Sequence, residues 1–95
     1  MDRPKAVGRT LEDNHRVVIT EWRFAPGAET GWHKHGMDYV VVYRTDAQHT
    51  VETAGETVSV ALEAGKSYFR AAGVEHNVIN SGQEEILLVE TELKP

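Results

Sequence analysis

The chain contains no cysteine among its 95 residues. Disulfides, thiolate zinc sites and cysteine nucleophiles are therefore excluded, and nitrogen and oxygen atoms have to hold any bound metal. Basic residues are also few, because ten Lys and Arg stand against fifteen Asp and Glu and the formal net charge is −5. Contacts to phosphate groups need a basic surface, and the scattered basic residues form none. We therefore expect no nucleic-acid partner and no membrane partner.

Long apolar runs are missing as well. The opening residues 1–5 lack the apolar run of a signal peptide, and no stretch approaches the length of a membrane span. The sequence also lacks a nucleophile elbow, a phosphate-binding loop and an adenine-binding pattern. We expect a soluble, cytoplasmic protein whose partner is a small-molecule ligand or substrate.

The composition is that of a small globular protein, with 40% apolar and aromatic residues and 26% charged residues. The length predicts a single domain over residues 1–95. So short a chain leaves much of its apolar surface near solvent. We therefore expect a homodimer in which a second copy covers one face of a sheet.

Helical periodicity is absent, and the chain breaks into short segments rich in Val, Ile, Thr and aromatic residues. Gly, Pro and Asn separate these segments. The pattern predicts strands over residues 17–24, 32–35, 38–44, 48–52, 56–62, 67–70, 76–80 and 86–93, after a weakly structured lead-in or edge strand over about residues 1–14. Residues 38–44 are apolar on both faces, as in a strand covered on both sides. Strands at this spacing predict an all-β sandwich or barrel.

Two of the five histidines, His33 and His35, are two residues apart in an expected strand. Side chains at this spacing point the same way, with Cα atoms roughly 6–7 Å apart, so two imidazoles can reach one metal ion. A third ligand has to come from another strand. His15 and His49 are interpreted as ordinary surface or loop histidines.

Two longer patterns place these histidines in context. The first is Gly27-x5-His33-x-His35, and the second is Gly65-x5-Ala71-x-Gly73-x2-His76-x3-Asn80. In order and separation they resemble the two sequence motifs of the cupin superfamily. The segments GWHKHGMDYVVV and YFRAAGVEHNVIN are similar to a group of small single-domain cupins connected with β-alanine degradation. The resemblance implies a jelly-roll β-barrel with inward-facing metal ligands.

Carried over residue by residue, the resemblance implies that His33, His35 and His76 are metal ligands. It also implies that Gly73 lies in a turn, where a missing Cβ permits positive φ, and that Asn80 closes a turn. Ala71 stands where the family usually has proline.

The glutamate of the first cupin motif is missing, since its two allowed positions hold Tyr39 and Val40. Asp38 lies one position early and is an alternative oxygen ligand if the turn at Gly36 shifts the register. Strict strand alternation instead places Tyr39 inward and Asp38 outward. The fourth ligand, Asp38 or Tyr39, is left open.

The implied cofactor is one divalent transition metal: Fe, Mn, Ni, Co or Zn. Without Asp38 the site resembles the three-histidine iron centres of thiol and diketone dioxygenases, and with Asp38 it resembles the commoner pattern of three histidines and one carboxylate. The first hypothesis is a metal-dependent enzyme, a dioxygenase or other oxidoreductase, acting on a small polar metabolite in the barrel. The alternative is a non-catalytic module that binds a small ligand or metal. A third hypothesis is a metal ion that only stabilises the fold.

Two residues near the motifs are candidates for contact with a substrate. Tyr39 could donate a hydrogen bond or a proton, or be a packed aromatic residue. Arg70 could pair with a substrate carboxylate, or be a solvated surface residue. The remaining aromatic residues near the motifs are interpreted as core or cavity wall: Trp22, Phe24, Trp32 and Tyr68.

Overall fold

The computed structural model describes residues 3–95, and these form nine strands and no helix. The strands are β1 (Val7–Asp13), β2 (Val17–Phe24), β3 (His33–Lys34), β4 (Asp38–Tyr43), β5 (Ala47–Glu52), β6 (Thr57–Leu62), β7 (Ser67–Arg70), β8 (Glu75–Asn80) and β9 (Ile86–Leu93). No helix among residues 3–95 has the length and apolar character that a membrane crossing requires.

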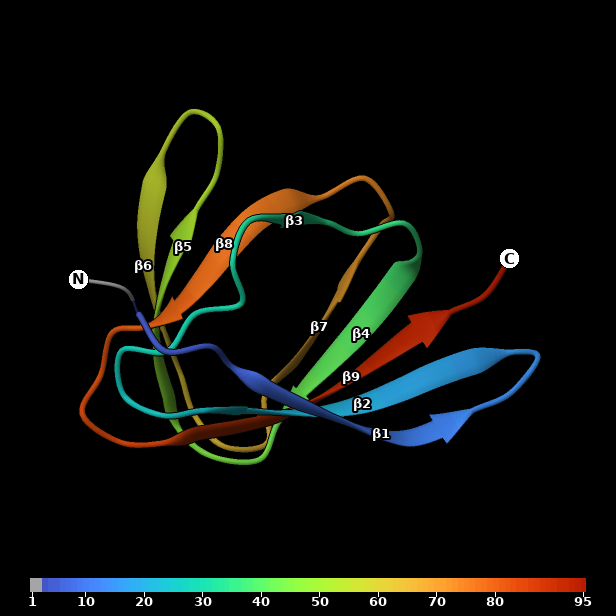
Figure 1. The fold of residues 1–95 in the computed structure, drawn as a ribbon, viewed down its shortest axis with the longest axis horizontal. Coiled ribbons are helices and arrows are strands. Elements are labelled where there is room, and N and C mark those ends of the chain that lie inside the picture. Colours follow the sequence, from blue (N-terminus) through green and yellow to red (C-terminus); the bar gives the residue numbers. More distant parts are fainter. Residues whose placement is uncertain (1–2) are drawn as a thin grey trace.

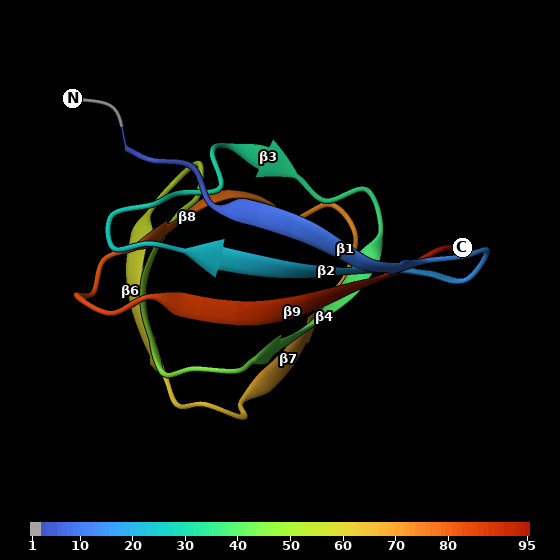
Figure 2. The ribbon, with the colours of Figure 1, turned by 60° about the horizontal axis from the view of Figure 1, so that its bottom comes forward.

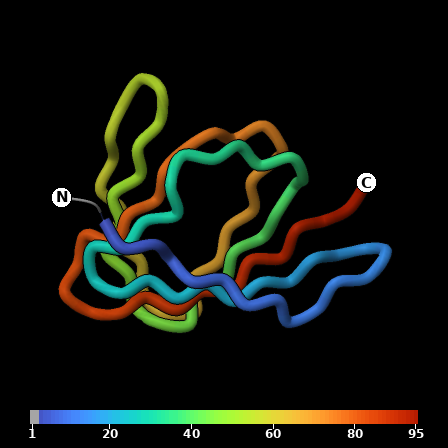
Figure 3. The backbone as a smooth tube through the Cα atoms, viewed as in Figure 1, coloured from blue at the N-terminus to red at the C-terminus, as the bar shows by residue number. Residues whose placement is uncertain are grey.

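The strands lie in two antiparallel sheets, with the orders β1-β2-β9-β4-β7 and β3-β8-β5-β6. Figure 1 shows the two sheets facing each other around a common interior, with the β1–β2 and β5–β6 hairpins extending from it. Figure 2 shows the five-stranded sheet as one layer, and Figure 3 traces the chain as it passes between the sheets. This arrangement confirms the predicted all-β jelly-roll barrel.

Alternation along the strands decides which side chains enter the barrel. On β4, Tyr39, Val41 and Tyr43 are buried, whereas Val42 on the other face is 41% exposed. The core combines this face with apolar residues from neighbouring elements: Phe24, Ala28, Ala47, Ile86 and Leu88. Within residues 3–95 the outer face of this strand is only partly covered, since Val42 is 41% exposed and Val40 is half-buried.

The lead-in contains more structure than its composition indicates. Residues 7–13 form β1, an edge strand that pairs with β2 and is exposed along its whole length. Because β1 adds main-chain hydrogen bonds but little buried apolar area, its sequence has no alternating pattern to reveal it. This result agrees with the edge-strand alternative, and residues 1–2 of the predicted lead-in lie outside the described residues.

Two residues of the second motif form turns as expected. Gly73 has a φ of 105°, a conformation that side chains with a Cβ rarely adopt. Asn80 is buried, and its Oδ1 accepts the Gly82 N–H at 3.0 Å. Its Nδ2 donates to the carbonyls of Phe24 and Glu84. Asn80 therefore ties the β8–β9 turn to the end of β2.

Candidate metal centre

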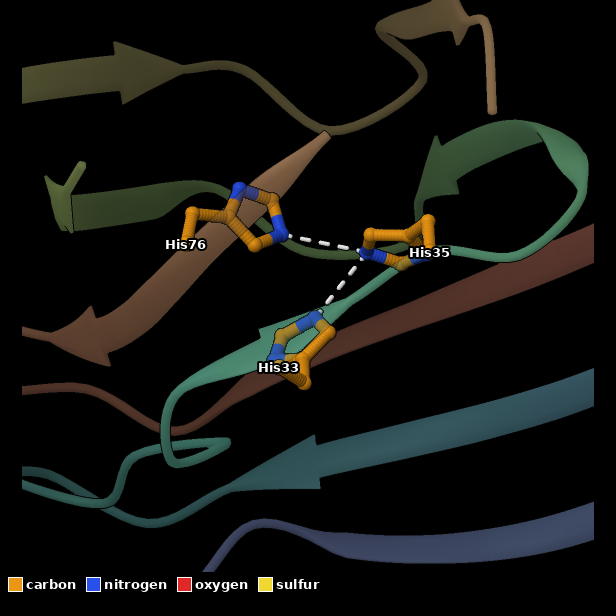
Figure 4. A group of neighbouring side chains, drawn as sticks. All are labelled: His33, His35 and His76. Carbon is orange, nitrogen blue, oxygen red and sulfur yellow. Dashed lines mark hydrogen bonds between the residues drawn. The ribbon is translucent and has the colours of Figure 1, made fainter. Parts of the chain in front are cut away.

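Three histidine side chains meet inside the barrel. His33 begins β3 and pairs across the sheet with His76 of β8, while His35 follows β3. The Nε2 atom of His35 lies 2.9 Å from that of His33 and 3.1 Å from that of His76. Figure 4 shows the three rings pointing toward one another. Residues 41 positions apart in the sequence thus form one cluster.

The other ring nitrogen of His33 fixes its tautomer. Nδ1 lies 2.8 Å from the carbonyl oxygen of Gly31, which can only accept, so Nδ1 carries a proton and, in the neutral ring, Nε2 presents the lone pair. Gly31 reaches this position with a φ of 84°. Hydrogen bonds of this kind orient histidine ligands in metal sites.

His35 is held by its main chain and by a ring. Its N–H donates to the Val74 carbonyl and its carbonyl accepts the Gly73 N–H, both at 2.8 Å. Its imidazole stacks on Tyr39, with ring centroids 3.9 Å apart and planes at 17°. The turn after β7 and the start of β4 therefore both position this side chain.

Burial keeps two of the imidazoles neutral. Burial, and then the neighbouring His33, lowers the pKa of His35 to about 4. The pKa of His76 falls to about 4 for the same two reasons, with a smaller effect of His35. Near pH 7 both rings are neutral, as metal ligation requires.

The cluster fits a transition-metal ion. Nitrogen ligands about 2.0–2.1 Å from an ion and at right angles to each other lie about 2.8–3.0 Å apart. The separations of 2.9 Å for His33–His35 and 3.1 Å for His35–His76 are close to this spacing, and all three ligand atoms lie within 4.8 Å of one another. The three Nε2 atoms have only each other as polar contacts in the described residues, so His33, His35 and His76 would hold the ion.

The structure does not bring Asp38 into the cluster. Its side chain is exposed, and its Oδ1 accepts the Ala72 N–H at 2.8 Å, which secures the turn before β8. Strict alternation is therefore retained across Gly36, with Tyr39 inward and Asp38 outward. Val40 also faces outward, next to Phe69 on β7.

Tyr39 and Arg70 are neighbours in the β4–β7 register. Tyr39 is only 1% exposed, and its Oη has no hydrogen-bond partner among residues 3–95. Arg70 is exposed, with its guanidinium carbon 4.4 Å from the centroid of the Tyr68 ring. Its Nη1 donates to the Phe69 carbonyl. Arg70 thus lies against the Tyr68 ring and is exposed to solvent, whereas Tyr39 is buried in the barrel interior.

The histidines open into a cavity of about 330 Å³. Its apolar walls include Trp22, Val41 and Leu88, and two carboxylic acids of β9, Glu90 and Glu92, also line it. Burial, and then the neighbouring Glu92, raises the pKa of Glu90 to about 7. Sequence reasoning missed both acids, although alternation from Ile86 and Leu88 predicts that residues 90 and 92 face inward.

Two further expectations are wrong. His49 is 1% exposed rather than a surface residue, because it packs between Phe24 and Tyr43 at the cavity wall. Its burial lowers the pKa of His49 to about 4. Trp32, expected in the core or cavity wall, is 51% exposed because it precedes β3 on the outside of the barrel. His15 is exposed, as expected.

Comparison with known proteins identifies the class. A family described as "Cupin domain" matches residues 20–92, so the chain belongs to the cupin family. The Beta-alanine degradation protein BauB of Pseudomonas aeruginosa is 56% identical over 92 residues, 97% of each chain.

Solved structures agree with this assignment. A cupin domain of Bordetella pertussis Tohama I matches with a TM-score of 0.96 and 52% identity, over 100% of this chain and 99% of that one. A protein of Thermus thermophilus matches with a TM-score of 0.74 and 26% identity, over 96% and 86% of the two chains. The resemblance seen in the two motifs is confirmed.

Proposed function

We propose that the protein holds one divalent transition metal with His33, His35 and His76 and acts as a metal-dependent oxidoreductase, of dioxygenase type, on a small polar metabolite. The convergence of three Nε2 atoms on the wall of a cavity of about 330 Å³ carries this proposal. The similarity to BauB supports a metabolite that belongs to the breakdown of β-alanine.

The ligand set suits Fe, Mn, Ni, Co or Zn. A divalent ion held by three neutral imidazoles keeps its full charge and open coordination positions, and it supplies Lewis acidity or, if it is iron, dioxygen binding. Because affinity rises from manganese toward nickel, the metal found after purification can differ from the working metal.

The chain's own residues bind and enclose the metabolite. Trp22, Val41 and Leu88 form apolar walls against which the non-polar part of a metabolite can pack. The carboxyl group of Glu90 can hold or release a proton near neutral pH, since its pKa is about 7. The cavity therefore contains an acid–base group on the sheet opposite the histidines.

Oxygen consumption tests the catalytic proposal. Protein loaded with Fe(II) is mixed with β-alanine and a panel of three-carbon acids and thiols. We expect oxygen uptake with at least one compound, loss of uptake in His33→Ala and His76→Ala, and normal uptake in the control His15→Ala. The experiment is repeated with Mn, Ni, Co or Zn in place of Fe(II). If no compound is chemically changed with any of these five metals, the proposal is contradicted.

A non-catalytic binding module is the second candidate. It is favoured by the lack of a carboxylate in the histidine cluster among the described residues. A panel compound that raises the melting temperature and is recovered unchanged by mass spectrometry would favour this candidate over the enzyme.

We also propose a homodimer in the cytoplasm. The outer face of the five-stranded sheet presents Val7, Val42, Phe69 and Leu93, all more than a third exposed. A second copy covering this face would bury them. Light scattering should give twice the chain mass for the wild type and the single chain mass for Val42→Glu; cell fractionation tests the location.

A further inference from the structure

Glu90 and Glu92 lie on the inner face of β9, where the alternation places them in line with the core residue Leu88. Glu92 pairs with Tyr39 of β4, and Glu90 pairs with Val41. Neither carboxylate takes part in an ion pair within residues 3–95. Desolvated carboxylates without a positive partner destabilise a fold. Glu90 and Glu92 are half-buried in the barrel interior, and their placement is accounted for if a cationic ligand binds beside them.

Two of the side chains that line the same cavity each carry an unpartnered polar atom among the described residues. The Oη of Tyr39 and the Nε2 of His49 are buried without a hydrogen-bond partner among the described residues, and each side chain is 1% exposed. Buried polar atoms are rarely left unpaired in folded proteins. Tyr39 is the cross-strand neighbour of Glu92 and its ring stacks on His35, so this side chain adjoins both the carboxylate strand and the histidine cluster.

The other walls also suit a positive charge. The ring of Trp22 lines the cavity, and aromatic faces attract ammonium groups, whereas the Tyr68 ring already has the guanidinium of Arg70 4.4 Å from its centroid. Apart from the histidines, Lys34 is the one cationic residue among the described residues that line the cavity, and its side chain is exposed. The interior therefore has carboxylates on one sheet and the histidine cluster on the other.

We propose that Glu90 and Glu92 form an ammonium-binding subsite, and that the ligand is a small aliphatic amino acid whose carboxylate binds the metal while its ammonium group binds these two residues. The substrate class rests on the proposed metal site, but the ammonium subsite does not. The cavity of about 330 Å³ limits the ligand to a small molecule.

Calorimetric titration tests the subsite. The probes are β-alanine, propionate, which lacks the ammonium group, and propylammonium, which lacks the carboxylate. In zinc-loaded wild type we expect β-alanine to bind at least tenfold more tightly than propionate. Glu90→Gln and Glu92→Gln should each weaken β-alanine at least tenfold and change propionate less than threefold. The control Glu56→Gln, an exposed residue of the β5–β6 turn, should behave as wild type.

Metal-free His76→Ala separates this proposal from the metal site. Propylammonium should bind this variant as it binds wild type, and adding Glu90→Gln should weaken it tenfold. Equal binding of β-alanine and propionate to wild type, or unchanged β-alanine binding in both Gln variants, would overturn the subsite. Loss of zinc from either Gln variant would also overturn the subsite, because it would show that the carboxylate is a metal ligand. A wild type that binds propylammonium but no metal would refute the metal site alone.

Discussion

The aromatic ring of Tyr39 stacks on the imidazole of His35, with centroids 3.9 Å apart and an angle of 17° between the planes. Tyr39 occupies one of the two positions, with Val40, at which the first cupin motif has its glutamate. The chain thus uses this position to orient a histidine by packing.

Replacing Tyr39 by leucine should weaken metal binding. The substitution removes the stacked ring and frees the imidazole of His35 to rotate, and loss of such supporting contacts typically lowers metal affinity 10–100-fold. Tyr39→Phe keeps the ring and should bind metal as wild type does. Competition with a chelator measures both affinities, and equal values for Tyr39→Leu and wild type would contradict the positioning role.

Asp38 should contribute to stability without contributing to metal binding. Asp38→Ala removes the acceptor for the Ala72 N–H and should lower the free energy of unfolding by about 1 kcal/mol. Asp38→Asn keeps an acceptor oxygen and is the control. Denaturant unfolding gives the stability and elemental analysis gives the metal; metal loss from Asp38→Ala would show that the side chain turns inward to ligate.

Asn80→Ala should destabilise the barrel strongly. It removes three hydrogen bonds and leaves the buried Phe24 carbonyl without this donor, at a cost of about 2–4 kcal/mol. For a chain of this length the melting temperature should fall by more than about 10 °C. The exposed Gln83→Ala, in the same turn, should change it little. A fall of a few degrees or less in Asn80→Ala would contradict this role.

Glu90 should make the metal-free protein less stable as the pH rises. The pKa of Glu90 is about 7 in the folded state and has its ordinary value of 4.5 in the unfolded state. Between pH 4.5 and pH 7 the folded state therefore binds more protons than the unfolded state. Stability contributed by the protonated form is therefore complete below pH 4.5 and is lost as the pH rises to about 7. Glu90→Gln should be more stable than wild type at pH 8 by about 1–3 kcal/mol.

Thermal unfolding with a chelator present, from pH 4 to pH 8, measures this effect. Other titrating groups shape both curves, so the informative quantity is the difference between variant and wild type. Glu56→Gln should follow the wild-type curve. A difference between Glu90→Gln and wild type that does not grow with pH would mean that Glu90 has an ordinary pKa.

Local patterns predicted most of the fold. β2, β7 and β9 have the bounds expected from their Val, Ile and aromatic content, and the His33–His35 spacing predicted that two rings share one direction. For β1 the sequence offered an edge strand only as an alternative to a weakly structured lead-in and did not give its bounds, because an exposed edge strand needs no apolar alternation. The burial of His49 depends on contacts with Phe24 and Tyr43 from other strands, so its sequence neighbours do not reveal it.

The acids of the cavity are a different case. Alternation already places residues 90 and 92 on the inner face of their strand, as two carboxylates where apolar residues are usual. Charged residues at inward positions of a strand are therefore a usable signal of a ligand cavity, provided that the fold class is known.

Metal stoichiometry tests the central claim most directly. The wild type, His33→Ala, His76→Ala and the control His15→Ala are purified without added metal, incubated with one equivalent of zinc, freed of unbound ions and analysed for metal. We predict about one ion per chain in the wild type and the control, and none in the other two variants, all with the wild-type circular dichroism spectrum. Metal retained by folded His33→Ala and His76→Ala, or none bound by the wild type, would contradict the account.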